Sequence, residues 1–247
     1  MKALEPNERG SIITVCIIPA RGGSKRIPRK NIKLFCGLPM IAYSIRAALE
    51  SDVFKRVIVT TDDQEIAEIA VNYGAETPFL RPAELADDYQ SVGKPMMHAL
   101  EWLKESGFEF DFHCMLFATA PFVRPERLRE SFEIFRARPD KAECFSVVEY
   151  TFPIQRAIRI TEDGAADMFQ PEYFSCRSQD LEQAYHDAGQ FSWAAYSRPN
   201  LDQTAWGPST LPYVIPHYEA VDIDTPDDWV RAELMYKALQ DAQGGQA

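Results

Sequence analysis

The sequence predicts an α/β fold with a mostly parallel sheet and helices on both of its faces. Short apolar runs alternate with amphipathic helical segments between residues 11 and 150, and this alternation is typical of βαβ units. The chain has 247 residues, of which 46% are hydrophobic, so a single domain spanning 1–247 can bury a large core. Ligands of such sheets bind at loops that leave the carboxyl ends of the strands.

The first part of this pattern holds two strand and helix pairs. The run "SIITVCII" at 11–18 is almost unbroken apolar and β-branched, which indicates a strand covered on both faces. Apolar residues at helical spacing predict a helix over 38–49. The strand "RVIVTT" at 56–61 and a helix over 62–74 follow, and Gly74 is placed to end that helix.

The alternation continues as far as residue 150. We expect a helix near 94–104, a strand at 112–118, a helix at 127–138 and a strand at 144–150. Each of these segments has the length of an ordinary secondary-structure element. Together with the first part they predict the central sheet and the helices that cover it.

The pattern breaks over 151–186, where Asp163 and Gly164 predict a hairpin turn instead of another helix. We interpret this stretch as a small β-rich insertion into the domain. Returning strands are expected at 189–196 and 211–218. The last helix is expected over 225–239, with Thr225 as its cap and Pro226 at its first position.

Charge is distributed unevenly along the chain. The net charge of −11 argues against a general binder of nucleic acids or membrane surfaces, because both are polyanions that an acidic protein repels. The segment from Arg21 to Lys33 nevertheless carries six basic side chains and no acidic one. This local charge of +6 predicts a small anionic ligand at that segment.

The cysteines indicate a reducing compartment, for which the cytoplasm is our expectation. No two of the five form a CxxC pair, and the N-terminal residues "MKALEPNERG" do not contain the apolar core of a signal peptide. No stretch approaches the roughly twenty apolar residues that span a bilayer. The five residues are Cys16, Cys36, Cys114, Cys144 and Cys176.

The basic segment "PARGGSKRIPRKN" at 19–31 directly follows the first strand. It matches neither the GxxxxGK[ST] P-loop nor the GxGxxG dinucleotide fingerprint. We expect Gly22 and Gly23 to let the backbone turn and aim N–H groups at an anion, which the basic side chains neutralise. The alternative is a solvated basic loop with no ligand.

A second feature is "DID" at 222–224, where Asp222 and Asp224 fall on one face of an extended strand because side chains alternate with a period of two. Mg²⁺ prefers carboxylate and phosphate oxygens, so this pair and a triphosphate would make a metal site. The alternative is that Asp224 only caps the following helix.

These motifs together resemble those of the sugar cytidylyltransferases, which activate nine-carbon acidic sugars as CMP conjugates. The basic segment resembles the signature loop of that family. "VIVTTDD", "GAETPFLRPAELADD" and "VDIDTPDDW" resemble its second strand, its Arg-Pro loop and its metal-binding strand end, in the same order. "FATAPF", "YTFPIQRAI" and "RSQDLEQAYHDAGQFSW" are most similar to the branch that acts on pseudaminic acid, with the sialic and legionaminic acid branches as alternatives.

The resemblance implies a Rossmann-like nucleotidyltransferase that uses CTP and a nonulosonic acid, depends on Mg²⁺ and forms a homodimer through the insertion. The residues that it implies for the nucleotide are Arg21, Gly22, Gly23, Ser24, Lys25, Asn31 and Arg81. Those implied for catalysis are Lys30, Arg21 and Asp224. Those implied for the sugar are Arg177, Asp187 and Gln190, and those for the metal are Asp222 and Asp224.

The remaining basic side chains of the segment, Arg26, Arg29 and Lys33, are expected on the solvated face, since the family varies more in charge there. Among the histidines only His186 is a candidate site residue, and no two have ligand spacing. A rival of another class is a catalytically silent nucleotide-sensing module. Such a module could dispense with Asp222, Asp224 and Lys30, all of which are present.

Overall fold

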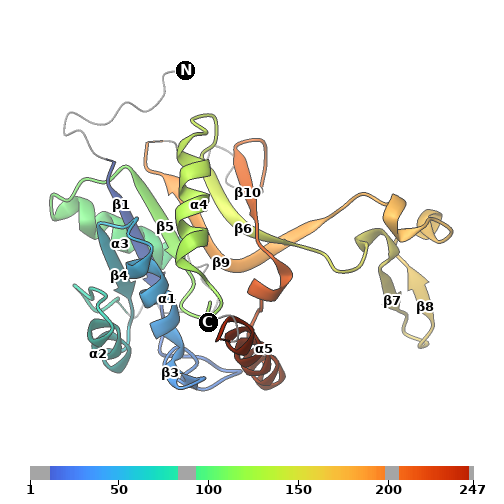
Figure 1. The fold of residues 1–247 in the computed structure, drawn as a ribbon, viewed down its shortest axis with the longest axis horizontal. Coiled ribbons are helices and arrows are strands. Elements are labelled where there is room, and N and C mark those ends of the chain that lie inside the picture. Colours follow the sequence, from blue (N-terminus) through green and yellow to red (C-terminus); the bar gives the residue numbers. More distant parts are fainter. Residues whose placement is uncertain (1–11, 83–92, 198–205, 245–247) are drawn as a thin grey trace.

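A six-stranded sheet forms the centre of the molecule in the computed structural model, which describes residues 12–82, 93–197 and 206–244 (Figure 1). Its strands lie in the order β10, β6, β9, β5, β1, β4. β1 pairs in parallel with β4 and β5, and β10 pairs in parallel with β6, whereas β9 runs antiparallel to both of its neighbours. The prediction of a mostly parallel sheet is confirmed. The bounds are β1 (Thr14–Pro19), β4 (Arg56–Thr60), β5 (Phe112–Leu116), β6 (Glu143–Glu149), β9 (Tyr185–Ala195) and β10 (Thr210–Val214).

Helices cover both faces of the sheet, as the sequence predicts. α1, α2 and α4 share one buried cluster with the strands, in which Ile45 of α1 and Phe135 of α4 meet Cys16 of β1. α3 covers the other face, where Leu103 packs in a cluster with Ile17. The bounds are α1 (Met40–Glu50), α2 (Gln64–Asn72), α3 (Gly93–Glu105) and α4 (Pro125–Arg136). None of the helices in the described ranges is long and apolar enough to cross a membrane.

A short hairpin and the last helix form a third cluster beside α1. β2 (Leu34–Phe35) and β3 (Leu38–Pro39) pair antiparallel, so the helix predicted from residue 38 begins only at Met40. The Phe35 ring is fully buried and contacts Trp229 and Tyr236 of α5 (Pro226–Gly244) at centroid distances of 5.5 Å. α5 is therefore packed against the β2–β3 hairpin, which follows the basic segment at 19–31.

Residues 150–184, here called the arm, join β6 to β9 and extend away from the sheet (Figure 1). Their hairpin, β7 (Ile158–Ile160) with β8 (Ala166–Met168), turns at Gly164, whose φ of +83° is one that favours glycine. The turn at Asp163 and Gly164 is thus where the sequence predicts it. Within the described residues, the 3₁₀ turns are η2 (Ile154–Arg156), η3 (Pro171–Tyr173), η4 (Ser178–Asp180) and η5 (His217–Glu219).

Candidate active site

The basic loop, defined here as residues 20–33, begins where β1 ends. β1 and β4 are parallel neighbours with Pro19 opposite Thr60, so the loop lies beside the acidic residues that follow β4. The first contact is the Ala20 N–H, which donates to the Thr60 carbonyl at 3.0 Å. In Figure 1 the β2–β3 hairpin after the loop, α2 and α5 lie along the lower part of the molecule. Carboxyl ends of parallel strands are where ligands bind in such sheets.

Asp62 holds the start of the basic loop. Its Oδ1 atom accepts a hydrogen bond from the Gly22 N–H at 3.1 Å and is 3.3 Å from a guanidinium nitrogen of Arg81. The Arg81 side chain is almost fully buried, and its Nε atom has no hydrogen-bond partner among the described residues. Burial lowers the pKa of Arg81, Asp62 raises it, and the nearby charge of Arg21 lowers it. Arg21 and Arg81 thus concentrate positive charge at the loop.

Gly22 is required by close approach and not by backbone conformation. A Cβ at this position would lie 2.6 Å from Oδ2 of Asp63, whereas a Cβ at Gly23 would meet no atom within 4 Å. Neither glycine has a left-handed φ, so the expectation that they turn the loop is wrong in its mechanism. The residue of the loop that does have one is Arg29, with φ of +55°. The Gly22 N–H is also directed at Asp62 and not at an open anion site.

The loop is closed from within by Asn31 and anchored by Ile27. The buried Asn31 side chain donates through Nδ2 to the carbonyl oxygen of Arg21 at 2.9 Å, joining the two ends of the loop. Ile27 is fully buried in the cluster that contains Phe35 and Ile223. Ser24 is half-buried, and the exposed loop positions are Arg21, Gly23, Lys25, Arg26, Pro28 and Lys33. The backbone is thus fixed while several of its polar and basic groups face solvent.

Lys30 points from the loop to the segment before α5. Its Nζ atom donates to the carbonyl oxygen of Ile223 at 2.8 Å and lies 3.3 Å from Oδ1 of Asp224. The other carboxylate oxygen of Asp224 is 2.9 Å from Arg26. Arg26 therefore has an acidic partner, contrary to the expectation that it faces only solvent.

Asp222 and Asp224 lie on the same side of the chain because the residues that alternate with them, Val221 and Ile223, are buried. This segment is extended, but it is not a hydrogen-bonded strand, which differs from the prediction. Desolvation raises the pKa of Asp222, and the neighbouring Asp224 carboxylate raises it further. Two carboxylates this close favour a cation.

Asp224 is not the cap of α5. The Asp228 N–H donates to Oγ1 of Thr225 at 3.2 Å, and Oδ2 of Asp228 accepts from the Thr225 N–H at 2.9 Å. This reciprocal pair satisfies the start of the helix. The Asp224 carboxylate instead contacts Lys30 and Arg26 of the basic loop, so the alternative that it only caps the helix is excluded.

The carboxylates of Asp222 and Asp224 supply some, but not all, of the ligands that a Mg²⁺ ion needs. Carboxylate oxygens of Asp222 and Asp224 are hard ligands of the kind that Mg²⁺ prefers. No group of three or more His, Cys, Asp and Glu side chains with metal-site geometry occurs in the described ranges. Phosphate oxygens and water would therefore have to complete the coordination, as is usual for Mg²⁺ bound to a nucleotide.

The residues expected to contact the sugar fall into two groups. Gln190 and Asp187 are on β9. Gln190 is buried and donates to the Glu219 carbonyl oxygen, and its Oε1 atom has no partner among the described residues. Asp187 Oδ1 accepts from the Gly189 N–H at 2.8 Å. Arg177 pairs with Asp180 at 2.7 Å and belongs to the arm, which extends away from the sheet and the loops at its edge (Figure 1).

Several residues at the site were not identified from the sequence. Asp62 and Asp63 support the basic loop, and Glu219 is a buried carboxylate that accepts from Nε of Arg127 at 2.8 Å. Arg29 pairs with Asp63 instead of facing only solvent, and Lys33 lies over the Trp229 ring at 4.4 Å. The signal for Asp62 and Asp63 was present, since they directly follow a strand that neighbours β1.

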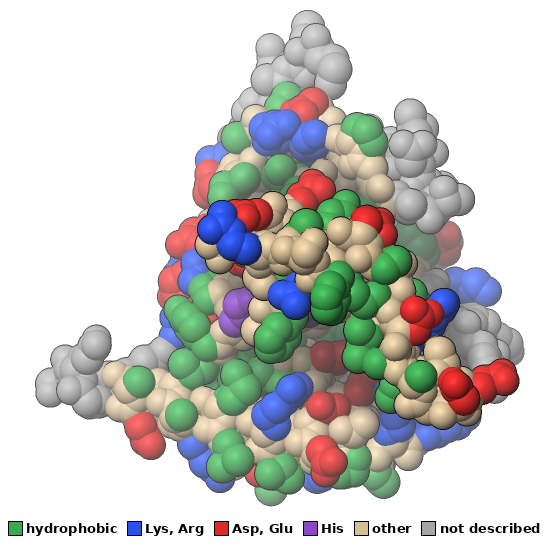
Figure 2. All heavy atoms as spheres, turned by 90° about the vertical axis from the view of Figure 1, so that its right-hand side faces the viewer, with side chains coloured by type: hydrophobic (Ala, Val, Ile, Leu, Met, Phe, Trp, Pro, Cys, Tyr) green, Lys and Arg blue, Asp and Glu red, His purple; other side chains and the backbone are tan. Residues whose placement is uncertain are grey.

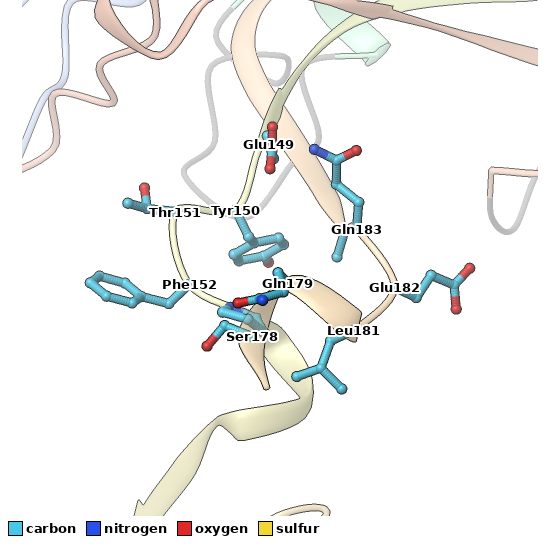
Figure 3. Close-up of a pocket in the computed structure, with 11 residues that line it drawn as sticks. Glu149, Tyr150, Thr151, Phe152, Ser178, Gln179, Leu181, Glu182 and Gln183 are labelled. Atoms are coloured by element: carbon cyan, nitrogen blue, oxygen red, sulfur yellow. The ribbon is translucent and has the colours of Figure 1, made fainter. Parts of the chain in front are cut away.

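A hollow of about 490 Å³ lies at the base of the arm, between residues 149–153 and 178–184 (Figure 3). Glu149, Gln179 and Glu182 are among the eleven residues that line it, and none of the eleven is Lys or Arg. The ring of the nearby His186 lies 4.7 Å from that of Tyr150. A lining without cations does not complement a triphosphate, so the nucleotide is expected at the basic loop.

Comparison with known proteins agrees with this geometry. Residues 15–188 match a protein family described as cytidylyltransferase. This chain belongs to the cytidylyltransferase family. Among its relatives, the pseudaminic acid cytidylyltransferase of Campylobacter jejuni is 42% identical over 90% of this chain and 96% of that protein. The CMP-N,N'-diacetyllegionaminic acid synthase of Legionella pneumophila is 33% identical over 92% of this chain and 98% of that protein.

Solved structures show the same cytidylyltransferase fold. A CMP:2-keto-3-deoxy-manno-octonic acid synthetase complexed with CTP matches with a TM-score of 0.65 and 17% identity, over 92% of this chain and 99% of that chain. A 4-diphosphocytidyl-2C-methyl-D-erythritol synthase from Anaerococcus prevotii matches with a TM-score of 0.57 and 12% identity. At these identities the likeness concerns the fold.

Proposed function

We propose that this cytidylyltransferase transfers CMP from CTP to the anomeric hydroxyl of a nonulosonic acid, with pseudaminic acid as the acceptor. The observation that carries the proposal is the meeting of Lys30, on a basic loop, with Asp224 of an acidic pair. In the reaction the anomeric oxygen forms a bond to the α-phosphorus, and the bond from that phosphorus to the bridging oxygen breaks. Pyrophosphate leaves, and the hydroxyl proton is released.

The basic loop supplies fixed positive charge for this transfer. Arg21 and Lys25 are exposed side chains of the loop and would hold the triphosphate, with Ser24 and the backbone of Gly23 beside them. Arg81 is buried next to the loop and Asn31 is buried within it, and both would contact the nucleotide. Lys30 would neutralise the charge that develops on the α-phosphate oxygens. Preorganised cations act strongly in this way because they need no rearrangement during the reaction.

Asp222 and Asp224 would hold Mg²⁺ together with the phosphates. When bound, the ion supplies positive charge to the triphosphate. In the protein itself, Lys30 and Arg26 keep the Asp224 carboxylate directed toward the loop. This arrangement places the carboxylates where the triphosphate is expected.

Recognition of the acceptor is proposed to use β9 and the arm. The Oε1 atom of Gln190, which has no partner within the described part of the chain, can accept a hydrogen bond from a sugar hydroxyl, with Asp187 on the same strand. Arg177 can bind the sugar carboxylate bidentately. Because the arm leads away from the basic loop of its own chain, Arg177 would serve the site of a second copy.

The surface of the arm supports a homodimer. Phe152, Ile160 and Phe174 are 81%, 80% and 74% exposed. Figure 2 views the molecule from the side on which the arm lies in Figure 1, and it shows several hydrophobic side chains on that face. Soluble proteins rarely expose contiguous apolar patches without a partner. A second copy would cover these side chains. All five cysteines are free, which supports a cytoplasmic location.

The function is tested by pyrophosphate release from CTP and Mg²⁺ with a panel of acceptors: pseudaminic, legionaminic, sialic and octulosonic acids. Turnover with pseudaminic acid alone is the expected result. Turnover with another of these acids would keep the reaction but change the acceptor. CTP binding without turnover of any acceptor would instead support a nucleotide-sensing module.

A further inference from the structure

The far end of the basic loop is held by Arg29. Its guanidinium group reaches both carboxylate oxygens of Asp63, with the Nη2 to Oδ1 distance at 3.0 Å, and also pairs with Glu65. Asp63 and Glu65 belong to the start of α2. A bidentate arginine and carboxylate pair fixes geometry as well as charge. This is the contact that ties residue 29 to a helix more than thirty positions further along the chain.

Asp63 connects three parts of the site. Its side chain is the cap of α2, because Oδ1 accepts from the Ile66 N–H at 3.0 Å. Its Oδ2 atom leaves no room for a Cβ at Gly22, at the near end of the loop. Arg29 binds it from the far end. One carboxylate therefore contacts both ends of the loop and the helix that supports them.

The backbone at Arg29 explains why such a contact is needed. Its φ of +55° is left-handed, a conformation that is strained for a residue other than glycine. The Arg29 carbonyl oxygen then accepts from the N–H groups of Ile32 and Lys33 at 3.0 and 2.9 Å. Strained backbone persists only where its surroundings hold it.

The turn at Arg29 sets the direction of the two residues that follow. The Lys30 side chain points to Asp224, and the Asn31 side chain points to the Arg21 carbonyl oxygen. A change in the Arg29 backbone would move both side chains together. A displacement of about 1 Å at a reacting centre can cost about 100-fold in rate.

We propose that Arg29 is a positioning residue, whose ion pair with Asp63 holds the left-handed turn that directs Lys30 toward Asp224. This inference rests on the proposed function, because it assigns Lys30 to the α-phosphate. The hydrogen bond from Arg29 lowers the pKa of Asp63, since it stabilises the ionised carboxylate. The role of Arg29 is indirect, and it does not require contact with CTP.

Three substitutions separate charge, geometry and backbone. Arg29→Lys keeps the positive charge but cannot make the bidentate contact. Arg29→Gly removes the ion pair but accommodates the left-handed turn without strain. Arg29→Ala removes the ion pair and leaves the left-handed turn strained. The control is Arg136→Ala, which removes a surface ion pair with Glu133 on α4. Thermal unfolding of each variant shows whether it is folded.

The inference predicts that Arg29→Ala and Arg29→Gly lower kcat by about 10- to 100-fold, while Arg29→Lys is intermediate and Arg136→Ala is unchanged. In the Lys30→Ala background, Arg29→Ala should lower kcat by less than threefold, because residues that act through one another are not additive. The CTP dissociation constant, measured by calorimetry without acceptor, should change less than kcat. Hydrogen exchange of residues 21–33 should rise in Arg29→Ala and Arg29→Gly alone.

Wild-type kcat in Arg29→Gly and Arg29→Ala would overturn the inference while leaving the proposed function intact. Equal losses in the presence and absence of the Lys30 side chain would also overturn it, since Arg29 would then act independently. Absence of turnover in the wild-type protein with every acceptor would contradict the proposed function itself and, with it, the role of Arg29.

Discussion

Lys30 and Asp224 form an ion pair of 3.3 Å although 194 positions separate them in the sequence. The pair joins the basic loop after β1 to the segment that leads into α5, and the Ile223 carbonyl oxygen at 2.8 Å adds a second contact for the same ammonium group. The fold therefore places the lysine proposed for the α-phosphate beside a carboxylate proposed for the metal.

Removal of the Lys30 side chain should lower turnover. Lys30→Ala is expected to reduce kcat by about 100- to 1,000-fold, the scale for loss of one group that stabilises transition-state charge. Steady-state pyrophosphate release measures it. Lys33→Ala is the matched control, since Lys33 lies over the Trp229 ring. Equal kcat in Lys30→Ala and the wild type would remove Lys30 from the mechanism.

Loss of one carboxylate charge should weaken the binding of Mg²⁺ at the site. Asp224→Asn is expected to raise the Mg²⁺ concentration needed for half-maximal activity, and excess Mg²⁺ should restore part of the rate. Titration of activity against Mg²⁺ gives this value. Asp227→Asn, at an exposed position in the first turn of α5, is the control. An unchanged Mg²⁺ titration in Asp224→Asn would make this aspartate structural.

Charge placed on the arm should separate the protein into monomers. Ile160→Asp and Phe174→Asp each put a carboxylate on an exposed apolar position, and burying it against a second copy would be costly. Sedimentation should then give the 28.1 kDa monomer instead of twice that mass. Leu234→Asp, at an exposed position on α5 and outside the arm, is expected to leave the dimer intact. A monomeric wild-type protein would contradict the dimer proposal.

Acid should destabilise the fold through His113. This side chain is buried in β5, its Nδ1 atom has no partner among the described residues, and burial lowers its pKa from 6.5 to about 4. Between these values the unfolded chain binds a proton that the folded protein does not, so the free energy of unfolding falls as the pH drops from about 6.5 to 4. The loss should approach about 3 kcal/mol.

Urea unfolding at several pH values measures this effect. His113→Gln should flatten the dependence between pH 6.5 and 4, whereas His217→Gln, at an exposed position, should not. If the two variants show the same slope as the wild type, His113 is not the group responsible.

The sequence predicts the sheet and helices well because each has a local cause. Periodicity marks the strands and helices, and Thr225 with Pro226 marks the start of α5. The error at residue 38 arose because Leu38 and Pro39 fit a helical start, whereas Phe35 is held in a cluster with α5 and pairs opposite Leu38.

The supports of the site could not be predicted in the same way. Arg29 was expected to face solvent because the family varies in charge at this position. Neither its left-handed backbone nor its ion pair with Asp63 has a sequence pattern that could have corrected this. Both depend on the parallel pairing of β1 with β4, which brings segments more than thirty residues apart together. By contrast, the two members of the Lys30 and Asp224 pair were each identifiable from motif resemblance.

The central claim is CMP transfer at the place where the basic loop meets the Asp222 and Asp224 pair. The most direct measurement uses CTP labelled at the α-phosphate with pseudaminic acid and Mg²⁺, and follows the label and the pyrophosphate. The account predicts that all of the transferred label appears in a CMP-sugar, in a 1:1 ratio with unlabelled pyrophosphate, and that Lys30→Ala suppresses both. Label that stays in CTP, or appears in free CMP without a CMP-sugar, would contradict it.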